Sequence, residues 1–275
     1  MNNIFIDIEA GKTDLYYWKD IWRYRELFYF LAWRDILVRY KQTAIGLTWA
    51  VLRPLATMIV FAVVFGKLAK LPSGGTPYPI LVFAGMLPWQ FFSNSILEAS
   101  NSLISNSNLI SKVYFPRLII PTSSIISSFV DFIISGIILF GLMLWYRFIP
   151  DWRIITLPLF TVVVFAASLG TGLWLTALNI KYRDFRYIVP FTVQFGLYVS
   201  PVGFSSDIVP EKWRLLYSLN PMVGIIDGFR WAILGKDIGN SNLAGFILSL
   251  MIVAVLFVSG IWYFRKTEKS FADMI

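Results

Sequence analysis

The 275-residue sequence contains no cysteine and no histidine, and only 15% of its residues are charged. The missing residue types exclude the usual His/Cys zinc site, a cysteine nucleophile, a Ser-His-Asp triad and any disulfide. Soluble domains carry about 25% charged residues. This chain instead is 57% hydrophobic and 17% aromatic, with a mean hydropathy of +0.67. Such a composition indicates an integral membrane protein built from helices.

Six apolar segments reach or approach the roughly 20 residues that a helix needs to cross a bilayer. They cover residues 44–65, 71–97, 118–146, 154–180, 187–206 and 238–264. Two of them contain a charge, Arg53 in the first and Asp131 in the third. We therefore predict an all-α protein with six transmembrane helices.

The basic residues predict the orientation of these spans. With both termini in the cytoplasm, sixteen of the 24 Lys and Arg residues fall on cytoplasmic segments, as the positive-inside rule requires. The net charge of +8 is thus a topology signal and does not indicate nucleic-acid binding. We expect a cytoplasmic N-terminal segment (1–43), one membrane domain (44–265) and a cytoplasmic tail (266–275).

Aromatic and basic side chains recur at helical spacing between residues 14 and 41. This pattern predicts an amphipathic helix in the cytoplasmic interface of the membrane, and the alternative is a helix packed on a partner protein. The residues that define it include Trp18, Trp22, Arg25, Trp33, Arg34 and Arg39.

Two connecting segments also have helical character. Residues 105–117, between the second and third spans, predict a short cytoplasmic helix stopped by Pro116, or else an ordinary loop. Residues 207–236 predict an outer hairpin of two helices too short to span, the second capped by Asn220-Pro221 and ending at Gly235. A re-entrant hairpin and a plain surface lid both fit this pattern.

Polar side chains within the spans allow two interpretations. Asn94, Glu98 and Asn101 form one stripe of the second span, and Asp131 lies near the middle of the third. A carboxylate at that depth costs about 2.5–3.5 kcal/mol, so it should face the interior or water. We expect no Lys or Arg within the spans to be available to pair with Asp131. These groups either join neighbouring helices or line a conduit.

Aromatic side chains cluster near this polar stripe. Trp89, Phe92 and Tyr198 could belong to the aromatic belt at the lipid interface, or could stack on sugars inside a polar conduit. A nucleotide site is excluded. Gly11-Lys12-Thr13 resembles the end of a phosphate-binding loop, but Ile6 stands where the first glycine is required.

Several short motifs occur in a characteristic order along nearly the whole chain, from about residue 15 to residue 265. They are Arg39-Tyr40-Lys41-Gln42-Thr43 with Gly46, Trp49 and Pro54; Ala84-Gly85-Met86-Leu87-Pro88-Trp89; Lys112-Val113-Tyr114-Phe115-Pro116-Arg117; Tyr182-Arg183-Asp184; Ser200-Pro201-Val202; and Asn220-Pro221 followed by Arg230. In this order the motifs resemble the permease subunits of ABC-type polysaccharide exporters. These proteins move O antigens, capsular polysaccharides and teichoic acids.

The resemblance implies a homodimer that pairs with two copies of a separate ATPase, which binds ATP and Mg²⁺. The substrate would be a polyprenyl diphosphate-linked glycan crossing the bacterial inner membrane, and this chain would bind no metal, cofactor or nucleic acid. We expect the channel to be lined by Trp89, Phe92, Asn94, Glu98, Asn101, Asp131 and Tyr198. We expect the ATPase to contact Lys112, Val113, Tyr114, Phe115, Pro116, Arg117, Tyr182, Arg183 and Asp184.

Two other functions remain open. A related ABC permease could export a small molecule or drug. An integral-membrane transferase acting on a lipid-linked sugar would need a general base, and without histidine the candidates are Glu98, Asp131 and Asp184.

Overall fold

The computed structural model describes residues 17–41, 46–235 and 243–271, and this part of the chain is helical without any strand. The elements are α1 (Tyr17–Arg23), α2 (Arg25–Lys41), α3 (Gly46–Phe61) with a π-helical continuation η1 (Ala62–Leu68), α4 (Tyr78–Ser105), α5 (Ser107–Lys112), α6 (Ile119–Trp145), the 3₁₀ turn η2 (Trp152–Thr156), α7 (Leu157–Lys181), α8 (Phe185–Val199), the 3₁₀ turn η3 (Ser206–Ile208), α9 (Glu211–Tyr217), α10 (Pro221–Leu234), α11 (Leu243–Thr267) and the 3₁₀ turn η4 (Glu268–Ser270).

Five of these segments are long and apolar enough to cross a membrane: Thr48–Leu68, Tyr78–Ser105, Ile119–Trp145, Trp152–Lys181 and Leu243–Ser270. They correspond to five of the six expected spans. The remaining one, residues 187–206, forms the 15-residue α8 and then leaves the helix at Ser200-Pro201. Such a helix is about 22 Å long, shorter than the hydrocarbon core.

Helix α4 is the central helix of the protein. In its most apolar stretch 83% of the residues are buried, whereas the corresponding value for the other candidate spans is between 17% and 28%. A helix that is apolar all round is covered either by other helices or by lipid, and the burial of α4 assigns it to the first case. Helices α3, α6, α7, α8 and α10 all pack against α4. The outward faces of the surrounding spans remain apolar, as expected for lipid contact.

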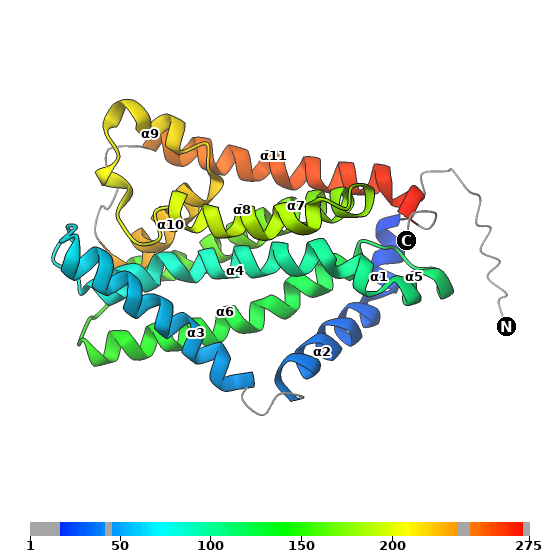
Figure 1. Ribbon diagram of the computed structural model, residues 1–275, viewed down its shortest axis with the longest axis horizontal. Helices are drawn as coiled ribbons and strands as arrows, with labels where there is room; N and C mark the ends of the chain where they lie inside the picture. Colours follow the sequence, from blue (N-terminus) through cyan, green and yellow to red (C-terminus); the bar gives the residue numbers. More distant parts are fainter. Residues whose placement is uncertain (1–16, 42–45, 236–242, 272–275) are drawn as a thin grey trace.

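The connecting elements separate into two groups at opposite ends of the molecule. Figure 1 shows α1, α5, the α7–α8 turn and the C-terminal end of α11 at one end of the long axis, and α9 and α10 at the other. The segments expected on the cytoplasmic side therefore lie together. Those expected on the outer side also lie together.

Helices α7 and α11 cross at a pair of glycines. A Cβ atom at Gly260 would lie 2.3 Å from the carbonyl oxygen of Gly170, and a Cβ atom at Gly170 would lie 2.5 Å from the carbonyl oxygen of Leu256. No side chain fits at either position. Small residues permit this close backbone approach, which is a common way to join helices in a bilayer.

Hydroxyl and amide side chains join other helix pairs. Thr176 Oγ1 of α7 donates to the Ala99 carbonyl of α4 at 2.8 Å, and Asn179 Nδ2 donates to the Ser100 carbonyl at 2.8 Å. Ser127 Oγ of α6 donates to the Ala32 carbonyl of α2 at 3.2 Å. For these serine, threonine and asparagine residues the structure supports the helix-joining role.

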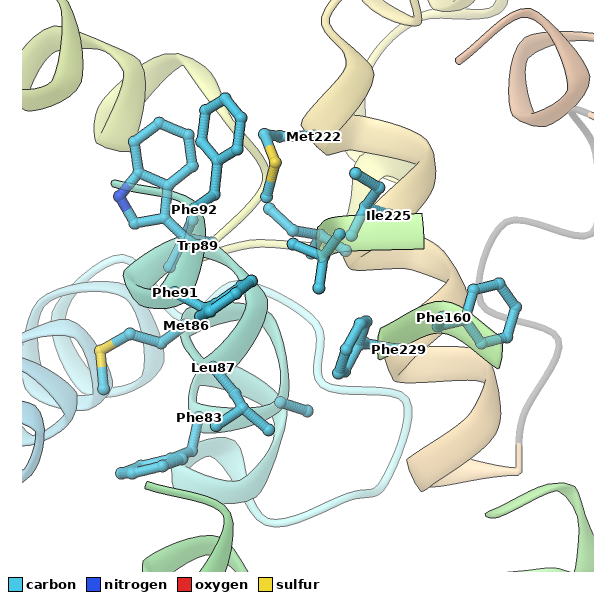
Figure 2. Close-up of a cluster of buried hydrophobic side chains, with 14 of the residues drawn as sticks. Phe83, Met86, Leu87, Trp89, Phe91, Phe92, Phe160, Met222, Ile225 and Phe229 are labelled. Atoms are coloured by element: carbon cyan, nitrogen blue, oxygen red, sulfur yellow. The ribbon is translucent and has the colours of Figure 1, made fainter. Parts of the chain in front are cut away.

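The outer segment contains the two short helices that its sequence predicts. The side chain of Asn220 caps α10 by accepting a hydrogen bond from the Met222 amide at 3.0 Å, and Gly235 ends the helix in the left-handed conformation at φ 66°. Helix α10 packs its apolar face against α4. Figure 2 shows Phe91 of α4 and Phe229 of α10 pointing into the space between these helices, with Phe160 beyond Phe229.

The N-terminal segment forms two helices instead of the expected single one, with a break at Tyr24. Leu31 and Ala32 of α2 are buried against α6. The aromatic side chains of Trp18, Trp22 and Trp33 remain exposed, which suits a helix at the membrane interface.

Candidate functional site

A groove of about 700 Å³ runs beside the central helix. Helices α3, α4, α6 and α8 form its walls, and the C-terminal end of α2 lies at one end of it. Its lining combines aromatic, amide and charged side chains, including Trp49, Trp89, Gln90, Asn94 and Gln194. The groove therefore offers flat apolar surfaces beside hydrogen-bonding groups.

A cluster of charges lies where α2 meets the groove. The guanidinium group of Arg39 pairs with Glu98 of α4 and with Asp131 of α6. The hydroxyl of Tyr40 donates to the second oxygen of Asp131, and Ser128 Oγ donates to Glu98 Oε2 at 3.2 Å. One arginine thus holds two carboxylates from two different spans.

The surroundings of this cluster shift the pKa values of its two α2 residues, Arg39 and Tyr40. Burial lowers the pKa of Arg39, but the attraction of Glu98 and Asp131 outweighs this and raises the pKa above its ordinary value. Burial and the hydrogen bond to Asp131 raise the pKa of Tyr40. Arg39 is charged and Tyr40 is neutral at any physiological pH, so the cluster keeps its ion pairs.

Asp131 has a cationic partner, although none was expected from within the spans. Arg39 lies outside the spans in the sequence, but α2 folds back along α6 and brings its guanidinium group to Asp131. Asp131 and Glu98 both line the groove and both hold α2 in place. The helix-joining and groove-lining interpretations therefore apply together to these two residues.

The other expected channel residues separate into two groups. Trp89 and Asn94 line the groove with Glu98 and Asp131. Phe92 is buried beside Trp89, with ring centroids 6.0 Å apart, and supports the wall from behind. Asn101 accepts a hydrogen bond from Asn179 of α7 at 3.2 Å and is one of the residues that join α4 to α7. Tyr198 is exposed on α8 and does not line the groove.

Other groove residues were not singled out as site candidates. Trp49, Arg53, Gln90 and Gln194 all face the groove, and Arg53 had been noted only as a charge within a span. Their positions on α3, α4 and α8 depend on how these helices pack. An unexplained charge inside an apolar span was the one available signal.

The expected ATPase-contact residues lie at the opposite end from the outer hairpin. Val113 and Tyr114, just after α5, are more than half exposed, and Tyr182, Arg183 and Asp184 form an exposed turn between α7 and α8. Lys112 is exposed, whereas Phe115 is buried and belongs to the core below the turn. A hollow of about 210 Å³ lies among Lys112, Val113, Tyr114 and Arg117.

A buried polar cluster near the outer end was missed from the sequence. Arg230 of α10 is fully buried and donates to the carbonyls of Leu81, Val202 and Phe204, with the last two at 2.8 and 2.6 Å. Burial lowers its pKa to about 10 despite the nearby Asp227. Burial also raises the pKa of Asp227 to about 6. The sequence draws attention to Arg230 only through the motif that begins at Asn220-Pro221.

The chain matches the family model of the ABC-2 type transporters over residues 26–234, from α2 to the end of α10. The chain belongs to the ABC-2 type transporter family. The matched region contains the groove, the Arg39 cluster and the buried Arg230. Together with its apolar helices, this membership makes the chain a multi-pass membrane protein.

This ABC-2 chain is also similar to named transport proteins over most of its length. It is 26% identical to the O-antigen export system permease protein RfbA of Myxococcus xanthus, covering 94% of this chain and 98% of that protein. It is 25% identical to RfbA of Klebsiella pneumoniae, over 88% and 92% of the two chains. It is 21% identical to the polysialic acid transport protein KpsM of Escherichia coli, over 86% and 92%. The family expected from the motifs is confirmed.

The ABC-2 chain shows no cluster of three or more potential metal-ligating side chains within its described residues. The Gly11-Lys12-Thr13 motif lies outside the described residues. The groove offers aromatic faces, amides and ion pairs for binding.

Proposed function

We propose that this chain is the membrane subunit of an ATP-driven exporter that carries a lipid-linked polysaccharide across the bacterial inner membrane. Two copies would enclose the channel, and two copies of a separate ATPase would bind ATP and Mg²⁺ and supply the energy. The proposal retains six membrane-crossing segments, with α8 as the shortest and both termini in the cytoplasm. The observation that carries it is the composition of the groove, and the RfbA and KpsM relatives support it.

The groove suits a sugar chain chemically. Trp49 and Trp89 provide flat faces for sugar C–H groups, and Gln90, Asn94 and Gln194 provide both donors and acceptors for hydroxyls. Arg39 neutralises much of the charge of Glu98 and Asp131, so the groove is polar without being strongly anionic. A neutral polyhydroxylated polymer can be held there weakly at many points and still move.

The energy for transport must come from a partner. ATP binding to the ATPase would favour one conformation of the membrane dimer over another through contacts at Lys112–Arg117 and Tyr182–Asp184. Val113 and Tyr114 are exposed apolar and aromatic side chains at this end of the molecule, as a protein contact requires. The exposed tryptophans of α1 and α2 would anchor the same end at the lipid interface.

The test of the groove compares two exposed tryptophans. Trp49→Ala removes an aromatic face from the groove, whereas Trp145→Ala removes one that lies at the end of α6 outside it. We expect cell-surface glycan to fall about fivefold or more in Trp49→Ala at equal protein level and to stay normal in Trp145→Ala. Equal export in the two variants would refute the assignment of the groove.

The test of the partner uses Val113→Asp, because Phe115 is buried and its loss would disturb the fold. We expect this variant to lose ATPase co-purification, while Ile149→Asp, an exposed control in the segment that follows α6, retains it. The purified complex should hydrolyse ATP faster when a polyprenyl diphosphate glycan is added. Stimulation by small hydrophobic compounds alone would favour the small-molecule exporter.

The transferase alternative lacks structural support. Both of its intramembrane base candidates, Glu98 and Asp131, are held by the same arginine, and Asp184 is exposed in a turn far from the groove. A carboxylate whose oxygens already accept hydrogen bonds from an arginine is not positioned to take a proton from a substrate.

A further inference from the structure

The η4 turn at the C-terminal end of α11 contains a third polar cluster, separate from the groove. Glu268 accepts a hydrogen bond from the hydroxyl of Tyr17 at 2.8 Å and, with its other carboxylate oxygen, one from the backbone amide of Arg117 at 2.6 Å. The guanidinium group of Arg117 in turn donates to the backbone carbonyl of Glu268. Three segments far apart in the sequence thus meet at one side chain.

Aromatic contacts reinforce this junction. The guanidinium group of Arg265 lies 4.5 Å from the ring centroid of Tyr17, within cation–π range. Phe271 is only 1% exposed and packs edge-on against Phe264, with centroids 5.3 Å apart. The same apolar cluster contains Leu31 of α2 and Phe115. The segment expected to be a cytoplasmic tail is, through Phe271, part of the core at this end.

The junction lies directly below the exposed turn of Val113 and Tyr114. Two residues at the base of that turn are fixed in place. Phe115 packs in the apolar cluster, and the backbone amide of Arg117 donates a hydrogen bond to Glu268. The tip of the turn, at Val113 and Tyr114, is exposed, while its base is tied to α11 and to α1. A force applied at the tip is therefore transmitted to a spanning helix instead of bending the turn alone.

We propose that Glu268 is a positioning residue for ATPase coupling, which fixes the turn at residues 113–117 to α11 and α1 so that the three move together. The proposal rests on the proposed function for the partner, but the junction itself is independent of it. Glu268 would contact neither substrate nor ATPase. Its effect would pass through Arg117 and Tyr17.

The first experiment measures the junction in the purified protein. We expect Glu268→Ala to speed hydrogen exchange of the amides at residues 113–117 by about tenfold or more, because the Arg117 amide loses its acceptor. Glu268→Gln keeps one carbonyl oxygen and should give an intermediate rate. Glu211→Gln, a change at an exposed acid on α9, should have no effect. Unchanged exchange in Glu268→Ala overturns the proposal.

The natural absence of cysteine permits an independent readout. A spin label on Val113→Cys would be the only label in the chain. We expect its mobility to rise in the Glu268→Ala background and to stay unchanged in the Glu211→Gln background. Equal mobility in both backgrounds overturns the proposal.

The second experiment measures coupling in the complex with the ATPase. We expect Glu268→Ala to retain ATPase co-purification and ATP hydrolysis within about twofold, while export falls about fivefold or more, with partial recovery in Glu268→Gln. Normal export in Glu268→Ala despite a loosened turn overturns this proposal alone. A wild-type chain that binds no ATPase overturns the proposed function, and the coupling role of Glu268 with it.

Discussion

The guanidinium group of Arg39 forms an ion pair with the carboxylate of Asp131, 92 positions further along the chain. The same guanidinium group also pairs with Glu98, so the interfacial helix α2 is fastened to two spans at the end of the groove. This relationship joins the segment expected at the cytoplasmic surface to the candidate conduit.

Removing Arg39 alone should lower the stability of the protein more than removing all three charges of the cluster. Arg39→Ala leaves two partly buried carboxylates without a cation, and we expect a loss of about 1–3 kcal/mol in unfolding free energy, allowing for partial solvent screening. The triple variant Arg39→Ala, Glu98→Gln, Asp131→Asn leaves no unpaired charge in this cluster and should recover most of the lost unfolding free energy. Thermal unfolding in detergent measures both. An Arg39→Ala protein as stable as the wild type would contradict the role of the cluster.

Replacing Asp131 alone separates folding from transport. An asparagine keeps one oxygen that can accept from Arg39, and its amide NH2 can donate to the Tyr40 hydroxyl, so we expect Asp131→Asn to assemble normally with a stability loss of about 1 kcal/mol. If Asp131 also serves the conduit, export should fall at normal protein level. Loss of the folded protein would instead assign Asp131 to helix joining alone. Size-exclusion chromatography and surface glycan staining together decide between these outcomes.

Gly85 should not tolerate a side chain. A Cβ atom there would lie 2.8 Å from the Arg230 guanidinium group, which is fully buried and has three carbonyl partners. We expect Gly85→Ala to cost about 1–3 kcal/mol because Arg230 must shift away from those carbonyls. Gly136→Ala is the matched control, since a Cβ atom at Gly136 meets nothing within 4 Å. Equal melting temperatures for the two variants would contradict the prediction.

Asp227 should make stability depend on pH. Its pKa in the folded protein is about 6, above the ordinary 3.8, so the folded state binds this proton more tightly than the unfolded state. The resulting stability is fully present below about pH 4 and is lost as pH rises through about 6, at most about 3 kcal/mol. Thermal unfolding between pH 4 and pH 8, with about one pH unit per step, should show the decline in wild type and a flatter profile in Asp227→Asn. A steep decline that persists in Asp227→Asn would assign it to other groups.

The cap of α10 can be tested with two substitutions. Asn220→Ala removes both the acceptor for the Met222 amide and the donor to Ser200 Oγ at 2.9 Å, and should cost about 1–2 kcal/mol. Asn220→Asp keeps the cap and loses only the donor, so it should cost less. Thermal unfolding measures the loss of stability in each variant. A larger loss in Asn220→Asp than in Asn220→Ala would contradict the capping role.

Most of the spans could be predicted from the sequence because the bilayer imposes a length and a composition on each helix separately. Asn220-Pro221 and Gly235 also predicted the limits of α10, since caps act locally. The length of α8 was not predicted. Its apolar run continues past Val199, but the chain leaves the helix at Ser200 and forms the loop whose carbonyls Arg230 binds.

The polar clusters escaped prediction because their members are far apart in the sequence. Arg39 is 59 positions from Glu98, and Arg117 is 151 positions from Glu268. Hydropathy assigns Arg39 and Arg230 to surface segments, where a charge needs no partner. Only the packing of α2 on α6 and of α10 on α4 shows that one arginine meets carboxylates and the other is buried.

The contact of Gly170 with Gly260 has a consequence for motion. Where two backbones touch, sliding one helix past the other brings their atoms into collision, so we expect α7 and α11 to move together as one rigid body. Through its hydrogen bonds to Tyr17 and Arg117, Glu268 joins α1 and the turn at residues 113–117 to this rigid body. Any widening of the groove then has to come from its own walls, α3, α4, α6 and α8, none of which belongs to this body.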